Sequence, residues 1–138
     1  MTPAIQSVVE TVIYVDDLAR SIEFYKNIMG LEQQMADARF AAFTVTQGQV
    51  FLIFVRGQTN SGVDTPGGFI PPHDARGPQH FAFGIDAAQI ESWTEKLNSA
   101  GVSIESAVRW PRGARSLFFR DPDGHLVELV TPGAWTNY

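Results

Sequence analysis

The sequence predicts an α+β fold built from two tandem modules, each with the order strand, helix, strand, strand, strand. Three observations support this: two alternating strand segments, a helical segment after each, and two hairpin segments that follow in the same order. With 138 residues, of which 44% are hydrophobic and 18% charged, the chain suits a globular domain with a substantial core. We expect one domain, with module 1 at about residues 7–56, a linker or lid at residues 57–77 and module 2 at about residues 78–132.

The first strand and the helix of each module follow a common pattern. Residues 10–16 (ETVIYVD) and 80–86 (HFAFGID) both alternate in polarity and end on an aspartate, and each Asp region is suited to begin a helix. Gly30 and Gly101 then follow the helical segments, where each suits the left-handed conformation that ends a helix. The core-facing stripes between these signals are Leu18, Ile22, Tyr25 and Met29 in module 1, and Ile90, Trp93, Leu97 and Ala100 in module 2.

The hairpin segments also match between the modules. Residues 39–54 (RFAAFTVTQGQVFLIF) align with residues 115–130 (RSLFFRDPDGHLVELV) at one constant offset, which pairs Leu52 with Glu128. The second hairpin turns at a DPDG sequence, whose residues favour a tight turn. We expect one further short strand before each hairpin, near residues 32–36 and 103–107.

The segment between the modules has a different character. Residues 57–77 are dense in glycine and proline and show no periodicity, which is typical of a linker or a lid. It contains His73, in the string IPPHDARG. This histidine is either an acid–base group carried by a lid or a solvent-exposed loop residue.

Three ionisable residues interrupt strands that are otherwise apolar: Glu10, His80 and Glu128. The period of two places His80 on one strand face with Ala82 and Gly84, whose small side chains leave room for a cavity. Glu128 shares a face with apolar neighbours, so its burial requires a cation, a metal or a proton.

Glu10 and His80 hold the same position in the two repeats. If a pseudo-two-fold axis relates the repeats, both project into one cleft, and with Glu128 they supply three ligands and leave coordination sites open, as a catalytic metal requires. One imidazole and two carboxylates favour Mn²⁺, Co²⁺, Ni²⁺ or Mg²⁺, with Zn²⁺ also compatible. Taken singly, each residue has a simpler interpretation: a hydrogen-bonded core histidine, or a solvated carboxylate at a strand end.

Other residues are candidates for the pocket wall. Arg112 and Arg115 suit a bidentate clamp on a carboxylate or phosphate, or a solvated hairpin edge. We expect His125, beside the turn, to face solvent. Four aromatic residues form either a pocket wall or part of the core: Phe43, Phe69, Trp110 and Phe118.

Composition excludes several classes of function. The formal net charge of −5 argues against a surface that binds nucleic acid, and no apolar run reaches the length of a membrane span. Residues 1–10 lack the pattern of a signal peptide, so we expect a cytoplasmic protein. The absence of cysteine excludes disulfides, thiolate ligands and cysteine catalysis.

Two strings carry a resemblance to a known family. VDDLARSIEFYKNIMGLE resembles the first strand–helix passage of the vicinal oxygen chelate superfamily, which includes glyoxalase I, bleomycin-resistance proteins and extradiol dioxygenases. SLFFRDPDGHLVELVTP resembles its closing hairpin. The likeness spans about residues 7–132 and implies an open, curved, eight-stranded mixed sheet around a metal.

The resemblance also implies site residues. His80 and Glu128 fall on ligand positions of the family. The first ligand position, commonly His and sometimes Gln, is Glu10 here, which argues against Fe²⁺-type dioxygenase chemistry. The fourth position used by glyoxalase I enzymes corresponds to Leu52, which argues against full glyoxalase I activity.

From these residues we expect a divalent-metal-dependent enzyme of the lyase or isomerase type that chelates vicinal oxygens of a small substrate. Glu10 or Glu128 would double as the base. The alternative is a metal-free protein that sequesters an aromatic or cationic drug in the same cleft, as bleomycin-resistance proteins do. Because one curved sheet of this size leaves apolar edges to cover, we also expect a homodimer, with each site built in one chain or across two.

Overall fold

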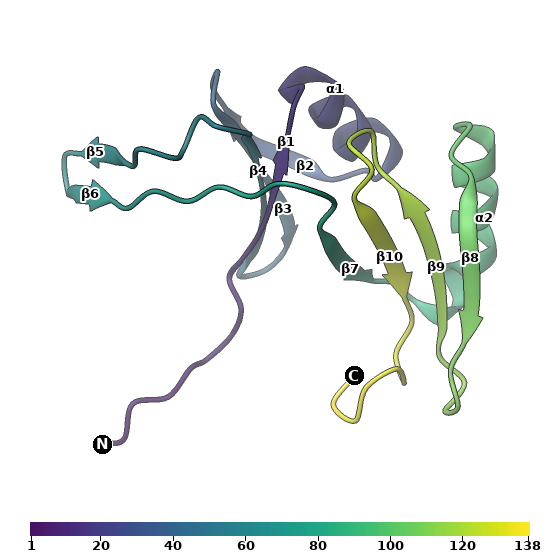
Figure 1. Cartoon of the computed structure of the whole chain (residues 1–138). Coiled ribbons are helices and arrows are strands. Elements are labelled where there is room, and N and C mark those ends of the chain that lie inside the picture. Colours follow the sequence, from purple (N-terminus) through teal and green to yellow (C-terminus); the bar gives the residue numbers. More distant parts are fainter. The chain divides into compact units, whose positions relative to one another are not determined.

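A computed structural model describes all 138 residues, and the chain divides into two compact units, Met1–Arg76 and Gly77–Tyr138. Unit 1 contains β1 (Glu10–Val15), α1 (Leu18–Glu23), the π-helical turn η1 (Phe24–Ile28), β2 (Glu32–Ala36), β3 (Phe40–Thr46), β4 (Gln49–Val55), β5 (Val63–Thr65) and β6 (Gly68–Ile70). Unit 2 contains β7 (His80–Gly84), the 3₁₀ turn η2 (Ala87–Gln89), α2 (Ile90–Ser99), β8 (Ile104–Arg109), β9 (Arg115–Arg120) and β10 (Leu126–Val130) (Figure 1). No helix is long and apolar enough to cross a membrane.

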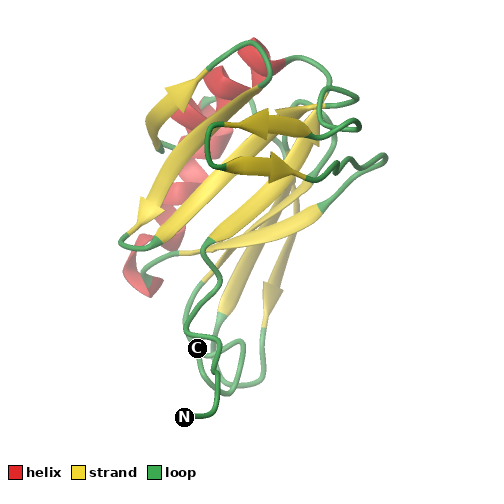
Figure 2. Cartoon of the chain, turned by 90° about the vertical axis from the view of Figure 1, so that its left-hand side faces the viewer, coloured by secondary structure: helices red, strands yellow, loops and turns green.

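The two units share one topology. Their four-stranded sheets have the orders β1-β4-β3-β2 and β7-β10-β9-β8. In each, the first pair is parallel and the others are antiparallel. Figures 1 and 2 show the helix of each unit along one face of its own sheet. The predicted α+β class and the βαβββ modules are confirmed, and backbone hydrogen bonding divides the eight module strands into two sheets of four.

Strand registers make the repeat equivalent residue by residue. Val12 of β1 lies opposite Leu52 of β4, and Ala82 of β7 lies opposite Glu128 of β10. In the same registers, Glu10 and His80 begin their strands at matching positions. The predicted equivalences of Glu10 with His80 and of Leu52 with Glu128 are therefore confirmed.

Local signals set the ends of the helices. The Asp17 carboxylate accepts the Arg20 N–H at the start of α1, and the Asp86 carboxylate accepts the Ala88 N–H at the start of η2. After the helical segments Gly30 and Gly101 have φ of 75° and 74°, the left-handed conformation predicted for both.

Each core lies between a helix and the facing side of its sheet. In unit 1, Tyr25 of η1 packs against Phe51 with ring centroids 4.8 Å apart and against Phe43 at 6.5 Å. In unit 2, Phe119 and Leu129 are fully buried. Alternation therefore turns every second residue of the central strands away from the helix, and the pockets lie on that other face.

The segment before unit 2 is more ordered than its composition suggests. The sequence did not predict β5 and β6, which pair as a hairpin that Figure 1 shows as a separate ribbon. Gly62 precedes this hairpin with φ of +72°, and a Cβ there would meet the Phe69 ring at 2.5 Å and the Ile70 carbonyl at 2.6 Å. Backbone contact between its ends also holds the segment, since the His73 N–H donates to the Thr59 carbonyl at 3.0 Å.

The equivalent core positions Phe43 and Phe119 allow a test of the repeat. Both are fully buried, so we expect Phe43→Ala and Phe119→Ala each to lower the free energy of unfolding by about 3–5 kcal/mol. Phe69→Ala, at a ring that is 56% exposed, is the control and should change it by less than about 0.5 kcal/mol. Urea unfolding measures all three. A small effect at either buried position would contradict the equivalence of the two cores.

Candidate functional site

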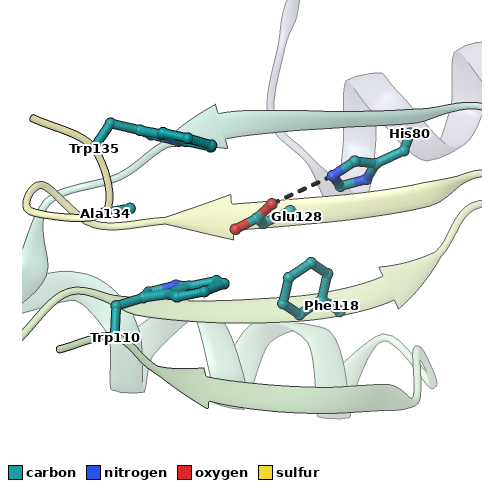
Figure 3. Close-up of a pocket in the computed structure, with 6 residues that line it drawn as sticks. All are labelled: His80, Trp110, Phe118, Glu128, Ala134 and Trp135. Atoms are coloured by element: carbon teal, nitrogen blue, oxygen red, sulfur yellow. Dashed lines mark ion pairs between the residues drawn. The ribbon is translucent and has the colours of Figure 1, made fainter. Parts of the chain in front are cut away.

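Unit 2 holds a pocket of about 360 Å³ on the sheet face that points away from α2 (Figure 3). The base is formed by β7, β9 and β10, and the sides by the loop after β8 and the segment after β10. The lining residues are His80, Trp110, Phe118, Glu128, Ala134 and Trp135. The pocket therefore joins two ionisable groups to a wall of aromatic rings.

His80 has a defined tautomer when it is neutral. Its Nδ1 lies 2.9 Å from the Leu126 carbonyl oxygen, which can only accept a hydrogen bond, so Nδ1 carries a proton. In the neutral ring the lone pair is then on Nε2, and Nε2 is the atom that faces Glu128 (Figure 3). A backbone carbonyl that orients an imidazole in this way is the usual support of a metal-ligating histidine.

A hydrogen-bond chain fixes the Glu128 carboxylate. The Ser116 hydroxyl donates to Glu128 Oε2 at 2.6 Å, and Trp110 Nε1 donates to the Ser116 oxygen at 2.8 Å. The Glu128 side chain is only 13% exposed, so these contacts compensate part of its desolvation. Sequence reasoning missed Ser116; the signal was its place on β9, two residues before Phe118 on the same strand face.

The other carboxylate oxygen faces the imidazole. Glu128 Oε1 lies 3.4 Å from His80 Nε2. A neutral His80 presents a lone pair toward a carboxylate oxygen, which is repulsive, so the gap favours a proton or a metal cation between the two atoms. A charged N–H···O contact is usually about 2.7–2.9 Å long, which is shorter than this separation.

The segment after β10 closes one end of this pocket. Tyr138 lies over Gly84 of β7, where a Cβ would collide with the tyrosine hydroxyl, and that hydroxyl donates to the Val130 carbonyl at 3.1 Å. Burial raises the pKa of Tyr138 above its ordinary value. Gly84 occupies the register position that Tyr14 holds in unit 1, so in unit 2 a tyrosine from another segment fills the equivalent space.

Unit 1 carries the equivalent pocket, of about 450 Å³. Its lining residues are Glu10, Val12, Tyr14, Leu52, Phe54, Ile70 and His73. Tyr14 and His73 are hydrogen-bonded, with 2.6 Å between the hydroxyl and Nδ1, and the His73 ring meets Phe54 edge-on at 4.8 Å. The interpretation of His73 as a solvent-exposed loop residue is therefore wrong, because its ring is half-buried against this wall.

The unit 1 pocket has fewer candidate metal ligands than the unit 2 pocket, because of the residues at positions 10 and 52. Glu10 is exposed at the start of β1, and Leu52, which cannot ligate a metal, occupies the position of Glu128. Within neither unit do three His, Asp or Glu side chains gather into a group that could hold a metal. Unit 2 supplies two candidate ligands, His80 and Glu128, and unit 1 supplies Glu10.

The two candidate arginines lie elsewhere. Arg115 points to the helix side of β9, where its Nη1 pairs with the Glu91 carboxylate of α2 at 2.9 Å. Arg112 is exposed, and its Nε donates to the Gly133 carbonyl at 3.1 Å. The expectation that they line the pocket as an anion clamp is wrong for unit 2, because alternation along β9 puts Arg115 on the opposite face from Ser116.

The structure also places the remaining aromatic candidates and His125. Phe43 is a core residue of unit 1 with no exposed surface, and Phe69 is exposed on β6, whereas Trp110 and Phe118 line the pocket of unit 2. His125 was expected to face solvent, yet it is fully buried. Its Nδ1 accepts the backbone N–H of Gln79 at 2.8 Å, which ties the turn before β10 to the start of β7.

Comparison with known proteins shows which proteins the chain is similar to. A family model described as Glyoxalase/Bleomycin resistance protein/Dioxygenase superfamily matches residues 7–129. The chain is 33% identical over 129 residues to Metallothiol transferase FosB of Staphylococcus saprophyticus, with 92% of this chain and 78% of that protein covered. It is 29% identical over 125 residues to Glutathione transferase FosA of Serratia marcescens, with 91% and 80% covered.

Solved structures agree with the sequence comparisons. The crystal structure of Lactoylglutathione lyase from Agrobacterium tumefaciens superimposes with a TM-score of 0.87 and 29% sequence identity. The match covers 97% of this chain and 99% of that one. All three similar proteins are enzymes by name.

The Tyr14 hydroxyl provides a test of the unit 1 pocket. Burial, and to a smaller degree the Asp74 carboxylate, raise the pKa of Tyr14 above its ordinary value near 10. The folded chain then holds this proton more tightly than the unfolded chain, so the stability it contributes is present below about pH 10 and is lost as the pH rises through the folded pKa. We expect Tyr14→Phe to flatten the decline of unfolding free energy above about pH 9, measured by urea unfolding at a series of pH values.

The slope of stability with pH is the relevant quantity, since Tyr14→Phe also removes the hydrogen bond to His73 at every pH. Tyr138→Phe is the matched control in unit 2, where burial raises the tyrosine pKa in the same direction. Tyr138→Phe should remove the part of the decline in unfolding free energy that comes from Tyr138, and should leave the part that comes from Tyr14 unchanged. If the curves of unfolding free energy against pH are parallel for wild type and Tyr14→Phe, the pKa of Tyr14 is not raised by folding.

Proposed function

The chain belongs to the Glyoxalase/Bleomycin resistance protein/Dioxygenase superfamily, and we propose that it is a divalent-metal-dependent enzyme acting on a small molecule. The observation that carries the proposal is the pairing of His80 with Glu128 in the aromatic pocket of unit 2. The names of similar proteins support it, because they include a metallothiol transferase and a lyase.

The geometry of the pair fits a bound cation. Two atoms that each lie about 2.1 Å from one ion are about 3.0 to 3.4 Å apart, depending on whether coordination is octahedral or tetrahedral. The 3.4 Å between His80 Nε2 and Glu128 Oε1 falls in this range. Glu128 Oε2 is held by Ser116, so Glu128 would ligate through Oε1 alone.

We propose Glu10 as the third protein ligand, because it holds in the first repeat the register position of His80 in the second. The predicted homodimer belongs to the same proposal, since Glu10 would come either from the same chain or from a second copy. Mixing Glu10→Gln with His80→Ala distinguishes the two sources. If metal binding recovers in the mixture, Glu10 and His80 of one site come from two copies. If a mixed dimer forms and metal binding does not recover, both residues come from the same chain.

When bound, the ion would supply Lewis-acid chemistry at vicinal oxygens of the substrate, in coordination sites that the protein leaves open. Glu10, exposed and without the hydrogen bonds that hold Glu128, is the better candidate to accept a proton from the substrate. The rings of Trp110 and Phe118 would exclude water from the reacting group.

The proposal also concerns the type of reaction. The set of one imidazole and two carboxylates favours lyase or isomerase chemistry over oxygen activation. The similar proteins are named for metallothiol, glutathione and lactoylglutathione, so we propose that a low-molecular-weight thiol or its adduct is one substrate. Assays of glutathione with an electrophilic acceptor, and of a glutathione hemithioacetal, separate transfer from lyase activity.

Metal binding is tested by thermal melts of wild type and His80→Ala with Mn²⁺, Ni²⁺, Co²⁺ or Zn²⁺. We expect wild type to gain roughly 2.7 kcal/mol at a hundredfold excess of metal over the dissociation constant, and His80→Ala to gain far less. The gain should shrink as the pH falls, because the ligands must lose protons before they bind.

Arg112→Ala is the control and should respond to metal like wild type, since Arg112 donates to the Gly133 carbonyl and does not line the pocket of His80 and Glu128. Equal shifts in wild type and His80→Ala would place the metal elsewhere. No shift in either, with purified protein free of metal, would favour the alternative function, a metal-free protein that binds an aromatic or cationic compound between Trp110 and Trp135.

Ser116 offers a separate test of the carboxylate. Ser116→Ala removes the hydroxyl that holds Glu128 Oε2, and loss of such support typically lowers metal affinity about 10- to 100-fold. Ser106→Ala, at an exposed serine of β8, is the matched control and should leave affinity unchanged. Isothermal titration calorimetry with Mn²⁺ measures both. Unchanged affinity in Ser116→Ala would show that Glu128 does not need this support to ligate.

A further inference from the structure

We propose that Trp110 and Trp135 form a slot for a planar aromatic group of the substrate, beside the oxygen-binding pair His80 and Glu128. This rests on the proposed function for the metal and names the class of substrate that the site takes. The ligand is an aromatic compound that carries adjacent oxygen donors, such as a hydroxyl next to a carboxylate.

The two indoles are arranged as opposite walls. Figure 3 shows both rings close to edge-on, one on either side of the pocket, with the Glu128 carboxylate beyond the space between them. They come from separate segments, since Trp110 follows β8 and Trp135 follows β10. A flat ring entering between them would place its substituents toward Glu128 and His80.

The exposure of these rings points to an absent partner. Trp135 is 71% exposed and Trp110 is 36% exposed, although tryptophan gains most from burial of its large apolar surface. Both belong to one pocket of about 360 Å³, which is within the usual size range of small-molecule sites. A stacked aromatic group would cover both rings at once.

The two walls are held by different contacts. Trp110 Nε1 donates to the Ser116 hydroxyl, and Ser116 is almost fully buried, so this ring is held in place before any ligand binds. Trp135 lies on a segment whose contact with β7 is made by Tyr138 over Gly84. The Trp110 ring therefore sets the plane of the ligand, and Trp135 forms the opposite wall.

Charge selects the aromatic acid over an organic cation. An exposed indole face attracts cations, and Glu128 alone would add to that attraction. A divalent ion at His80 and Glu128 reverses the local charge, so the site then favours an anionic or neutral oxygen donor. The metal-loaded and metal-free proteins should therefore differ in which ligands they take.

The experiment compares mandelate with hexahydromandelate by isothermal titration calorimetry in the presence of Mn²⁺. Both acids have the same charge and the same vicinal oxygens, and they differ only in a flat phenyl or a puckered cyclohexyl ring. We expect mandelate to bind roughly two- to tenfold more tightly, the usual effect of aromatic stacking beyond area burial.

Matched tryptophan variants locate the effect. Trp135→Leu keeps apolar bulk and should abolish the preference for mandelate, while hexahydromandelate affinity stays within about twofold. Trp93→Leu is the control: Trp93 lies on α2 with the Lys96 ammonium 4.8 Å from its ring centroid, outside this pocket, and the preference should remain. Circular dichroism confirms that both variants are folded, and Trp110→Phe should retain part of the preference.

Equal affinities for the two acids in wild type, or a preference that survives in Trp135→Leu, would overturn the slot even if Mn²⁺ binds normally. Failure of the metal proposal is seen separately, as absence of any heat from Mn²⁺ alone. In that case the same comparison with benzyltrimethylammonium and cyclohexylmethyl-trimethylammonium decides the slot. Tighter binding of benzyltrimethylammonium than of the cyclohexylmethyl analogue, lost in Trp135→Leu, supports the slot. Equal binding of the two compounds overturns it.

Discussion

The parallel pairing of β7 with β10 is the constraint on which the candidate site depends. It sets Leu126 opposite His80 and Glu128 opposite Ala82, so the imidazole can donate to the Leu126 carbonyl while its other nitrogen reaches the next outward-facing side chain. A register shift of one residue would turn Glu128 toward α2 and the apolar core, away from Ser116 and His80. The site is thus a consequence of strand register, and the helix on the other face keeps that register by burying Leu129 and its apolar neighbours.

The two repeats preserve this framework and differ in the chemistry that they carry. The β1–β4 pair has the same parallel register, but it presents Leu52 where unit 2 presents Glu128. Tyr14 supplies in unit 1 the ring that Tyr138 supplies over Gly84 in unit 2. Backbone pairing and core packing can therefore remain fixed while side chains on the outward face change, because those side chains contribute little to the cores.

The sequence predicted the parts of the structure that local patterns determine. The eight module strands, the helix stops at Gly30 and Gly101, and the outward placement of His80 follow from periodicity and backbone preference within short segments. Contacts between distant segments were missed. His125 accepts a hydrogen bond from the Gln79 N–H far along the chain, and the pairing of Arg115 with Glu91 brings together β9 and α2. No local pattern encodes either contact.

The sequence predicted that Glu128 would need a partner, and the structure shows which groups hold one of its oxygens. An isolated carboxylate at 13% exposure would be costly, and the chain offsets that cost at one oxygen only, through Ser116 and Trp110. The second oxygen faces His80 Nε2, while the other ring nitrogen, Nδ1, donates its proton to the Leu126 carbonyl. A structural carboxylate would be more stable with both oxygens satisfied by donors of the fold. When His80 is neutral, the second oxygen faces a lone pair, which is the arrangement that the proposed cation would relieve. The hydrogen-bond chain that holds Glu128 also holds the Trp110 indole beside it.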